Sequence, residues 1–204
     1  KSMTGRWCSV AAALTAVGFL TDRIGKAVER QANEVLAADL RLRSQEPIPN
    51  TWRELAADYE LRTADMVSFP TVVFAGDESA LTTLLAVTDD YPLRGTVRVS
   101  DSLFSEQREV DGIPAAGEVW ADSALLARVG ADVGDRLAVG ETELRIAAVV
   151  TYRPDQSIGF ASLAPTLLMN VADLEATALI GVGSRVRYAL LIAGDEDAVS
   201  GFND

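Results

Sequence analysis

The residues of this chain that could do chemistry are mostly carboxylates and guanidinium groups. The sequence contains no histidine and one cysteine, Cys8. Without histidine, the Ser-His-Asp and Cys-His mechanisms and His-ligated zinc or haem are excluded. A single cysteine forms neither an intramolecular disulfide nor an all-cysteine metal site. Any chemistry therefore rests on acids and arginines.

Motifs for nucleotide binding are incomplete. Gly25-Lys26 is followed by alanine, and Leu20 stands where a P-loop has its first glycine. Gly181-Val182-Gly183 begins like a dinucleotide loop, but Val186 replaces the third glycine. A nucleophile elbow would have no histidine as its base. We interpret these segments as turns and loops, and we assign no catalytic, cofactor-binding or metal-binding residue.

Two acidic clusters have the residue types that hold a hard cation such as Ca²⁺. They are Asp89-Asp90 and Asp195-Glu196-Asp197, and neither has the spacing of an EF-hand loop. The chain contains 30 acids, so clusters of this size arise by chance. We interpret both as solvated loops. An acid pair of the glycosidase kind depends on a distance in the fold that the sequence does not give.

Arginine outnumbers lysine by 16 to 2, and two pairs stand out by their spacing. Arg41/Arg43 and Arg185/Arg187 are each two residues apart, which puts both side chains of a pair on one face of a strand. A guanidinium group recognises a carboxylate or a lipid phosphate in a planar, bidentate way. The simpler interpretation, which we favour, is that these arginines form local salt bridges.

Length and composition indicate a globular protein. The chain has 204 residues, enough for one domain or two small ones, and 49% of them are hydrophobic. A chain of this length can bury a sizeable core without disulfides or metals. Its formal net charge is −12, which repels phosphate backbones and disfavours nucleic-acid binding.

The first part of the chain has three possible interpretations. The segment 7–20 carries no charge, and as a helix its 14 residues would cover about 21 Å, less than a bilayer core. It could be the apolar region of a signal peptide, the end of a transmembrane helix, or a buried helix of a soluble domain. The segment 21–38 continues with an apolar stripe and oppositely charged pairs, which favours a helix leaving a membrane.

Short helices and strands alternate after residue 38. Pro70 in the β-rich segment 63–75 indicates an edge strand or a bulge. Asp122 is the expected cap of a helix with Gly130 at its end, and Thr51 to Glu54 is a capping box. The acidic tail from Gly194 is expected to be frayed. Strands are predicted at 40–43, 63–75, 81–87, 97–99, 119–120, 137–139, 144–150 and 185–192, and helices at 51–59, 123–129 and after Asn170.

Several segments, in order along residues 15–195, resemble the extracytoplasmic, MacB-like periplasmic core domains of MacB/FtsX-type ABC transporter permeases, nearest to their YbbP-like branch. The segments Tyr91–Gly95 and Gly117–Trp120 are the most telling, although none is specific alone. The others are Phe19–Ile24, Ala37–Leu40, Val67–Pro70, Phe74–Asp77, Val133–Asp135, and Ala164-Pro165 with Leu168–Asn170.

The resemblance implies an α+β fold of two lobes with a long N-terminal helix. Residues 1–20 would be the end of the first transmembrane helix, or vector-derived in part, and 21–38 an amphipathic stalk helix. A porter-like βαβ lobe would consist of 39–95 and 165–204, the latter beginning the return to the membrane. A smaller, mixed α/β sabre-like lobe would be inserted at 96–164.

The resemblance also implies a function without catalysis in this domain. A separate cytoplasmic ABC ATPase would hydrolyse ATP, and the remaining permease helices would transmit its motion to the domain. The domain would handle a lipid-like or hydrophobic substrate, or a periplasmic accessory protein, with no cofactor. We expect the polar loops 101–117 and 153–162 to contact the substrate or partner. A freestanding secreted or anchored ligand-binding module and a carboxylate-dependent hydrolase remain as alternatives.

Overall fold

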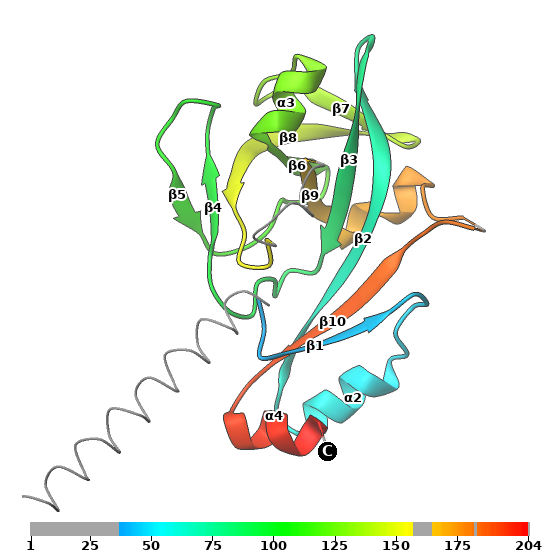
Figure 1. The fold of residues 1–204 in the computed structure, drawn as a ribbon, viewed down its shortest axis with the longest axis vertical. Coiled ribbons are helices and arrows are strands. Elements are labelled where there is room, and N and C mark those ends of the chain that lie inside the picture. Colours follow the sequence, from blue (N-terminus) through cyan, green and yellow to red (C-terminus); the bar gives the residue numbers. More distant parts are fainter. Residues whose placement is uncertain (1–36, 157–164, 182, 204) are drawn as a thin grey trace, which may run out of the picture.

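The computed structural model describes residues 37–156, 165–181 and 183–203 (Figure 1). The predicted membrane segment 1–20 and residues 21–36 of the predicted stalk helix lie outside the described residues. In the part that the structure describes, no helix combines the length and apolarity needed to cross a membrane. The described fold is dominated by a mixed sheet with a few short helices, and its class is α+β, as predicted.

The elements follow the predicted alternation closely. The strands are β1 (Leu40–Ser44), β2 (Arg62–Ala75), β3 (Glu78–Val87), β4 (Val97–Ser100), β5 (Arg108–Val110), β6 (Glu118–Asp122), β7 (Arg136–Val139), β8 (Thr142–Tyr152), β9 (Thr166–Asn170) and β10 (Arg187–Ala193). The helices are α2 (Thr51–Asp58), α3 (Ser123–Val129) and α4 (Glu196–Asn203), with short 3₁₀ turns η2 (Val171–Asp173) and η3 (Glu175–Thr177).

Nine strands pair in the order β1-β10-β2-β3-β9-β6-β8-β4-β5. All neighbouring pairs are antiparallel except β3–β9 and β6–β8. The short strand β7 pairs with both β8 and β2, so the pairings of β2, β3, β9, β6, β8 and β7 return to their starting strand. This closed circuit leaves few unpaired edges in the middle of the molecule.

The long hairpin β2–β3 shows why a proline is tolerated inside a strand. Pro70 pairs with Thr83 on the β3 side. On its other side, the ladder with β10 ends at Ser68 and the contact with β7 begins at Val73. Pro70 therefore sits where one side of the strand is locally an edge, and its missing N–H breaks no ladder there, as predicted from the sequence.

The helix α3 is capped as its sequence predicts. The Asp122 carboxylate accepts a hydrogen bond from the Ala124 N–H at 2.8 Å, and Gly130 ends the helix with a left-handed φ of 63°. The helix α2 was also predicted, but the capping box predicted at Thr51 to Glu54 is not formed. Its N-cap is Asn50, whose side chain donates to Glu54 rather than accepting from the helix backbone.

Buried side chains form three clusters. The first lies within the closed circuit, beneath α3, and includes the fully buried Val73, Leu84 and Ile146. The second lies on the face of β2, β3 and β10 that carries Met66, and the third lies where α2 and α4 cover β1 and β10. The helices α2 and α4 are thus side by side at one end of the molecule (Figure 1).

Three further sequence predictions need correction, and the strand β9 was not predicted. The tail after Gly194 is not frayed, because it forms α4 and buries Phe202 against α2. The predicted polar loop 101–117 contains the strand β5, which pairs with β4. The helix expected after Asn170 is only the short turn η2, although the Asn170 side chain caps it by accepting from Ala172 N–H at 2.9 Å.

Candidate functional site

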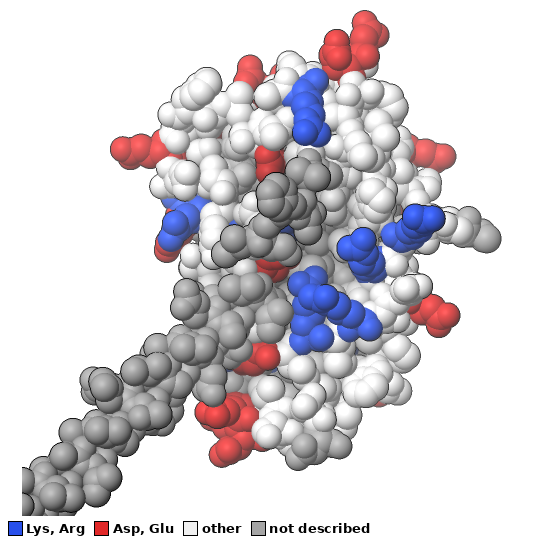
Figure 2. All heavy atoms as spheres, viewed as in Figure 1, with Lys and Arg blue, Asp and Glu red and all other residues white. Residues whose placement is uncertain are grey.

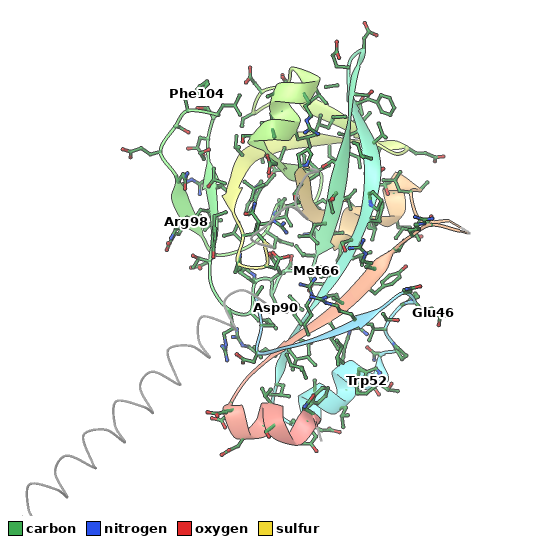
Figure 3. The ribbon with its side chains drawn as sticks, viewed as in Figure 1. Glu46, Trp52, Met66, Asp90, Arg98 and Phe104 are labelled. Atoms are coloured by element: carbon green, nitrogen blue, oxygen red, sulfur yellow. The ribbon has the colours of Figure 1, made fainter. Side chains whose placement is uncertain are left out.

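A cavity of about 590 Å³ opens where β1, β10, β2 and β3 meet the segment that follows β8. We call it the arginine cavity, because four of its lining residues are arginines. Figure 3 labels Met66, which belongs to its lining. The lining residues are Arg41, Arg43, Ser44, Gln45, Met66, Ser68, Thr83, Leu85, Arg153, Asp155, Gln156, Thr166, Arg187, Tyr188 and Ala189.

The strand register explains why these side chains share one face. In neighbouring strands, Arg43 lies opposite Ala189, and Ala189 lies opposite Met66. Alternate residues of a strand point to opposite faces, so Arg41 lies on the same face as Arg43. Leu40 and Leu42 point the other way, into the cluster under α2 and α4. The predicted alternation of β1 is therefore confirmed, and it points the arginine pair into the cavity.

One carboxylate of the cavity is fully engaged. Asp155 accepts hydrogen bonds from the Arg153 guanidinium at 3.2 and 3.3 Å, and another from the hydroxyl of Tyr91. Only 11% of the Arg153 side chain and 6% of the Asp155 side chain are exposed. Burial, and next the negative charge of Asp155, raise the pKa of Tyr91 well above its usual value, so this hydroxyl keeps its proton.

The other three arginines of the cavity have no carboxylate partner among the described residues. Arg41 donates from one terminal nitrogen to the sulfur of Met66 at 2.8 Å, and its buried Nε has no hydrogen-bond partner. Arg43 and Arg187 are exposed and make no ion pair within the described part. The same holds for Arg185, which does not line the cavity. Among the described residues, the salt bridges predicted for these two pairs are not formed.

The cavity concentrates positive charge on an acidic protein. Four arginines and one aspartate line it, whereas the whole chain has a net charge of −12. Figure 2 shows basic side chains gathering on this face, over the region where β1 and β10 lie in Figure 1. Burial lowers the pKa of Arg41, the nearby Arg43 lowers it further, and Asp155 opposes both effects. An anion placed among these groups would relieve their mutual repulsion.

The arrangement is suited to binding an anion. Guanidinium groups offer forked donors that fit carboxylate and phosphate oxygens. Hydroxyl and amide groups of Ser68, Thr83 and Gln156 add neutral hydrogen-bonding groups to the lining. The sequence had offered anion recognition by Arg41/Arg43 and Arg185/Arg187 only as the alternative to local salt bridges, and it had singled out neither Arg153 nor Asp155 within the predicted contact loop 153–162. Those two belong to a loop whose place beside β1 follows only from the fold.

The acidic clusters show no metal site. Asp195 accepts a hydrogen bond from the N–H of Asp197 at 3.1 Å, and Asp89 accepts from the side chain of Asn170 at 3.3 Å. Among the described residues, no group of three or more acids or cysteines is arranged to hold a metal ion. Of the predicted contact loops, residues 153–156 line the cavity in part, whereas 157–162 lie outside the described residues.

Comparisons with known proteins place the chain in a wider context. No protein-family model matches it. It is 33% identical, over 191 residues, to the uncharacterized ABC transporter permease YbbP of Escherichia coli (strain K12). The match covers 94% of this chain and 23% of the relative, so the chain spans about a quarter of that protein's length. The resemblance found in the sequence is confirmed: the chain is a domain related to the MacB/FtsX-type ABC transporter permeases.

Proposed function

We propose that the chain is a non-catalytic extracytoplasmic domain of an ABC transporter permease. The homology to a permease over 94% of the chain carries this proposal. It favours a transporter component over a freestanding binding module or a carboxylate-dependent hydrolase. Charged side chains spread over the face seen in Figure 2 are consistent with a part that lies in water. In this proposal the domain transmits ATP-driven motion to a lipid-like or hydrophobic substrate, or to a partner protein.

A clamp in the fold supports the transmission of motion. The first and last strands along the described chain, β1 and β10, lie side by side, since Leu40 of β1 pairs with Ile192 of β10. Arg94 binds both sides: its guanidinium donates to the two Asp39 carboxylate oxygens at 2.9 and 2.6 Å, and to the Gly194 carbonyl at 2.9 Å. A pull on the chain before residue 39 or after residue 194 would therefore act on one rigid point.

The cytoplasmic ABC ATPase and the remaining permease helices are the proposed partners of this domain. The proposed stalk helix would connect the clamp to the membrane, and the segment after α4 would return to it. Its predicted end at residue 38 was wrong, because residues 37–38 form a turn in which Ala37 has a left-handed φ of 59°. The division into an outer porter-like lobe, 39–95 with 165–204, and an inserted sabre-like lobe, 96–164, stays a prediction. The strand pairings join both predicted parts in one sheet, because β9 pairs with β6 and β2 pairs with β7.

Labelling of a cysteine from outside the cell tests the proposed side of the membrane. Phe104 lies in the connection between β4 and β5, is 97% exposed and points away from the fold (Figure 3). In the full-length permease with its other cysteines replaced, we expect Phe104→Cys to react with a membrane-impermeant maleimide in intact cells. The buried Ala86→Cys is the control that stays unlabelled. Labelling of Phe104→Cys only after permeabilisation would contradict the proposal.

A further inference from the structure

We propose that the arginine cavity binds a phosphate group carried on a hydrocarbon chain, with the chain lying along the exposed face of the β2–β3 hairpin. This inference names a ligand class for the domain and rests on the proposed function for its biological role. Its evidence, however, comes from the cavity and the hairpin alone. Two independent features carry it: uncompensated positive charge in the cavity, and an apolar strip that continues from the cavity wall.

The charge of the cavity favours phosphate over carboxylate. The carboxylate of Asp155 is already bound by Arg153 and Tyr91, so it makes no ion pair with the other three arginines, and its attraction for Arg41 does not offset the burial of that group. A single carboxylate would leave most of that charge uncompensated. A phosphate monoester carries up to two negative charges and three acceptor oxygens, which several guanidinium groups can share.

The buried Nε of Arg41 is a second feature that points to an anionic ligand. It is shielded from solvent and has no hydrogen-bond partner in the part of the chain that the structure describes. Native structures rarely leave a buried donor without a partner, and an unsatisfied one calls for an explanation. The adjacent donor of Arg41 is held only by the Met66 sulfur, a weak acceptor that a phosphate oxygen could replace.

An apolar strip leads out of the cavity along the hairpin. On β2, Met66 and Ser68 line the cavity, and the next residues on the same face are Pro70, Val72 and Phe74. Leu81 lies opposite Val72, on the face of β3 that carries Thr83 and Leu85 of the cavity lining. We call Val72, Phe74 and Leu81 the hairpin strip; they are 42%, 49% and 54% exposed.

The hairpin strip suits a hydrocarbon chain attached to the bound phosphate. Val72 is two residues beyond Pro70, which lies opposite the lining residue Thr83, so the strip begins about 7 Å from the cavity wall along the strand. Exposed apolar side chains grouped on one strand face commonly mark an interaction site. Because the strip continues from the wall of the cavity that the arginines line, one amphiphilic molecule could occupy both.

Calorimetric titration of the 204-residue chain tests the proposal with two probes. Inorganic phosphate reports on the cavity alone, and octyl phosphate reports on the cavity and the strip together. We expect octyl phosphate to bind at least ten times more tightly than inorganic phosphate, and both to weaken as salt is added. Equal affinity for the two probes, or tighter binding of octyl trimethylammonium, would overturn the proposal.

Substitutions separate the two halves of the site. Arg43→Gln with Arg187→Gln removes two exposed, unpaired charges, so the fold should persist while the affinity for both probes falls at least tenfold. Arg185→Gln is the matched control, since Arg185 is exposed and unpaired but lies outside the lining. Leu81→Ser with Phe74→Ser should weaken only octyl phosphate. If Arg185→Gln weakened binding as much as the double substitution in the cavity, the ligand site would be refuted. The proposed extracytoplasmic location would be unaffected, because it is tested separately by the labelling of Phe104→Cys.

Discussion

At the scale of single residues, Tyr91 links two distant loops. Its side chain is only 1% exposed, and its hydroxyl donates to Asp155, which is 64 residues away in sequence. Tyr91 opens the Tyr-Pro-Leu-Arg-Gly segment that gave the clearest resemblance to permeases. Its role is structural in this fold, because it fixes the carboxylate that in turn holds Arg153 at the wall of the arginine cavity.

The raised pKa of Tyr91 predicts a loss of stability in alkali. In the unfolded chain the hydroxyl loses its proton near pH 10, whereas in the fold it stays protonated to higher pH. The stability that this proton contributes is therefore present below about pH 10 and is lost as the pH rises towards the folded pKa. Tyr91 alone should lower the free energy of unfolding by about 1.4 kcal/mol per pH unit in this range.

Urea unfolding of the parent and of Tyr91→Phe between pH 7 and 11.5 measures this effect. At pH 7 the variant should be less stable by about 1–2 kcal/mol, because Asp155 loses a buried hydrogen bond. Above about pH 10 the difference should shrink, since phenylalanine has no proton to lose. A difference that stays constant across the whole pH range would show that the pKa of Tyr91 is not raised by the fold.

The clamp made by Arg94 is the second test at this scale. Arg94→Lys keeps the charge but loses the forked contact with Asp39 and the Gly194 carbonyl. We expect the free energy of unfolding to fall by about 1–2 kcal/mol. The matched control is Arg98→Lys, whose partner Glu109 is 58% exposed and 3.2 Å away, and which should cost less than about 0.5 kcal/mol. Equal effects of the two substitutions in urea unfolding would contradict the importance of the clamp.

At the scale of elements, the turn between β7 and β8 is held against η3. Gly140 has a φ of 61°, and a Cβ there would lie 1.9 Å from the carbonyl oxygen of Thr177. The neighbouring Glu141 N–H donates to that same oxygen at 2.9 Å. The contact ties the hairpin to the turn that follows β9, so the glycine is required by both conformation and space.

Comparison of Gly140→Ala with Gly130→Ala separates these two requirements. Gly130 has nearly the same φ, 63°, but a Cβ added there would meet no atom within 4 Å. Gly130→Ala should therefore cost only the backbone strain, about 1 kcal/mol, whereas Gly140→Ala should cost about 3 kcal/mol or more. Thermal or urea unfolding gives both values. Similar losses in the two variants would mean that the turn can move away from η3 without penalty.

The helix α4 gives a second prediction at this scale. Phe202 is 8% exposed and meets Trp52 and Tyr59 edge-on, each with ring centroids 6.1 Å apart. Phe202→Ala should lower the free energy of unfolding by about 3 kcal/mol. Phe104→Ala removes the same side chain from a 97% exposed position and should change it by less than about 0.5 kcal/mol. If the two variants unfold alike, the docking of α4 is refuted.

The elements differ in how well the sequence predicts them, and the reasons are physical. Alternating strands such as β1 and the capped helix α3 were predicted because their signals are local. The helix α4 was missed because its first turn is acidic and its one buried aromatic, Phe202, contacts rings that are distant in the sequence, those of Trp52 and Tyr59. The strand β5 was missed because it has three residues and no apolar alternation of its own.

At the scale of the whole molecule, local sequence patterns also fail to predict the arginine cavity. The spacing of Arg41 and Arg43 predicted that they share a face, but their lack of salt bridges depends on which carboxylates the fold brings near. The only carboxylate of the described lining, Asp155, is taken by Arg153 and Tyr91. The pairing of β7 with β2 closes the circuit of strands. It joins residues that are about 65 positions apart in the sequence, and no local sequence pattern predicts it.

The whole fold also brings its first and last described strands together. β1 and β10 are neighbours, and their ends meet at the Arg94 clamp, while the arginine cavity lies on the other half of the same two strands. A displacement of the clamp would therefore act directly on the strands that carry Arg43 and Arg187. This geometry connects the proposed transmission of motion with the proposed ligand site.

Hydrogen exchange in the full-length permease, assembled with its ATPase, tests the central claim most directly. The N–H groups of Asp39, Arg94 and Gly194 are bonded within the clamp, to the Ile192 and Ala37 carbonyls and to the Asp39 carboxylate, at 3.0 Å in each case. With an ATPase that binds but does not hydrolyse ATP, we predict that protection of these amides changes on adding ATP, while that of the core residue Leu84 does not. Identical exchange at the clamp with and without ATP would contradict the account.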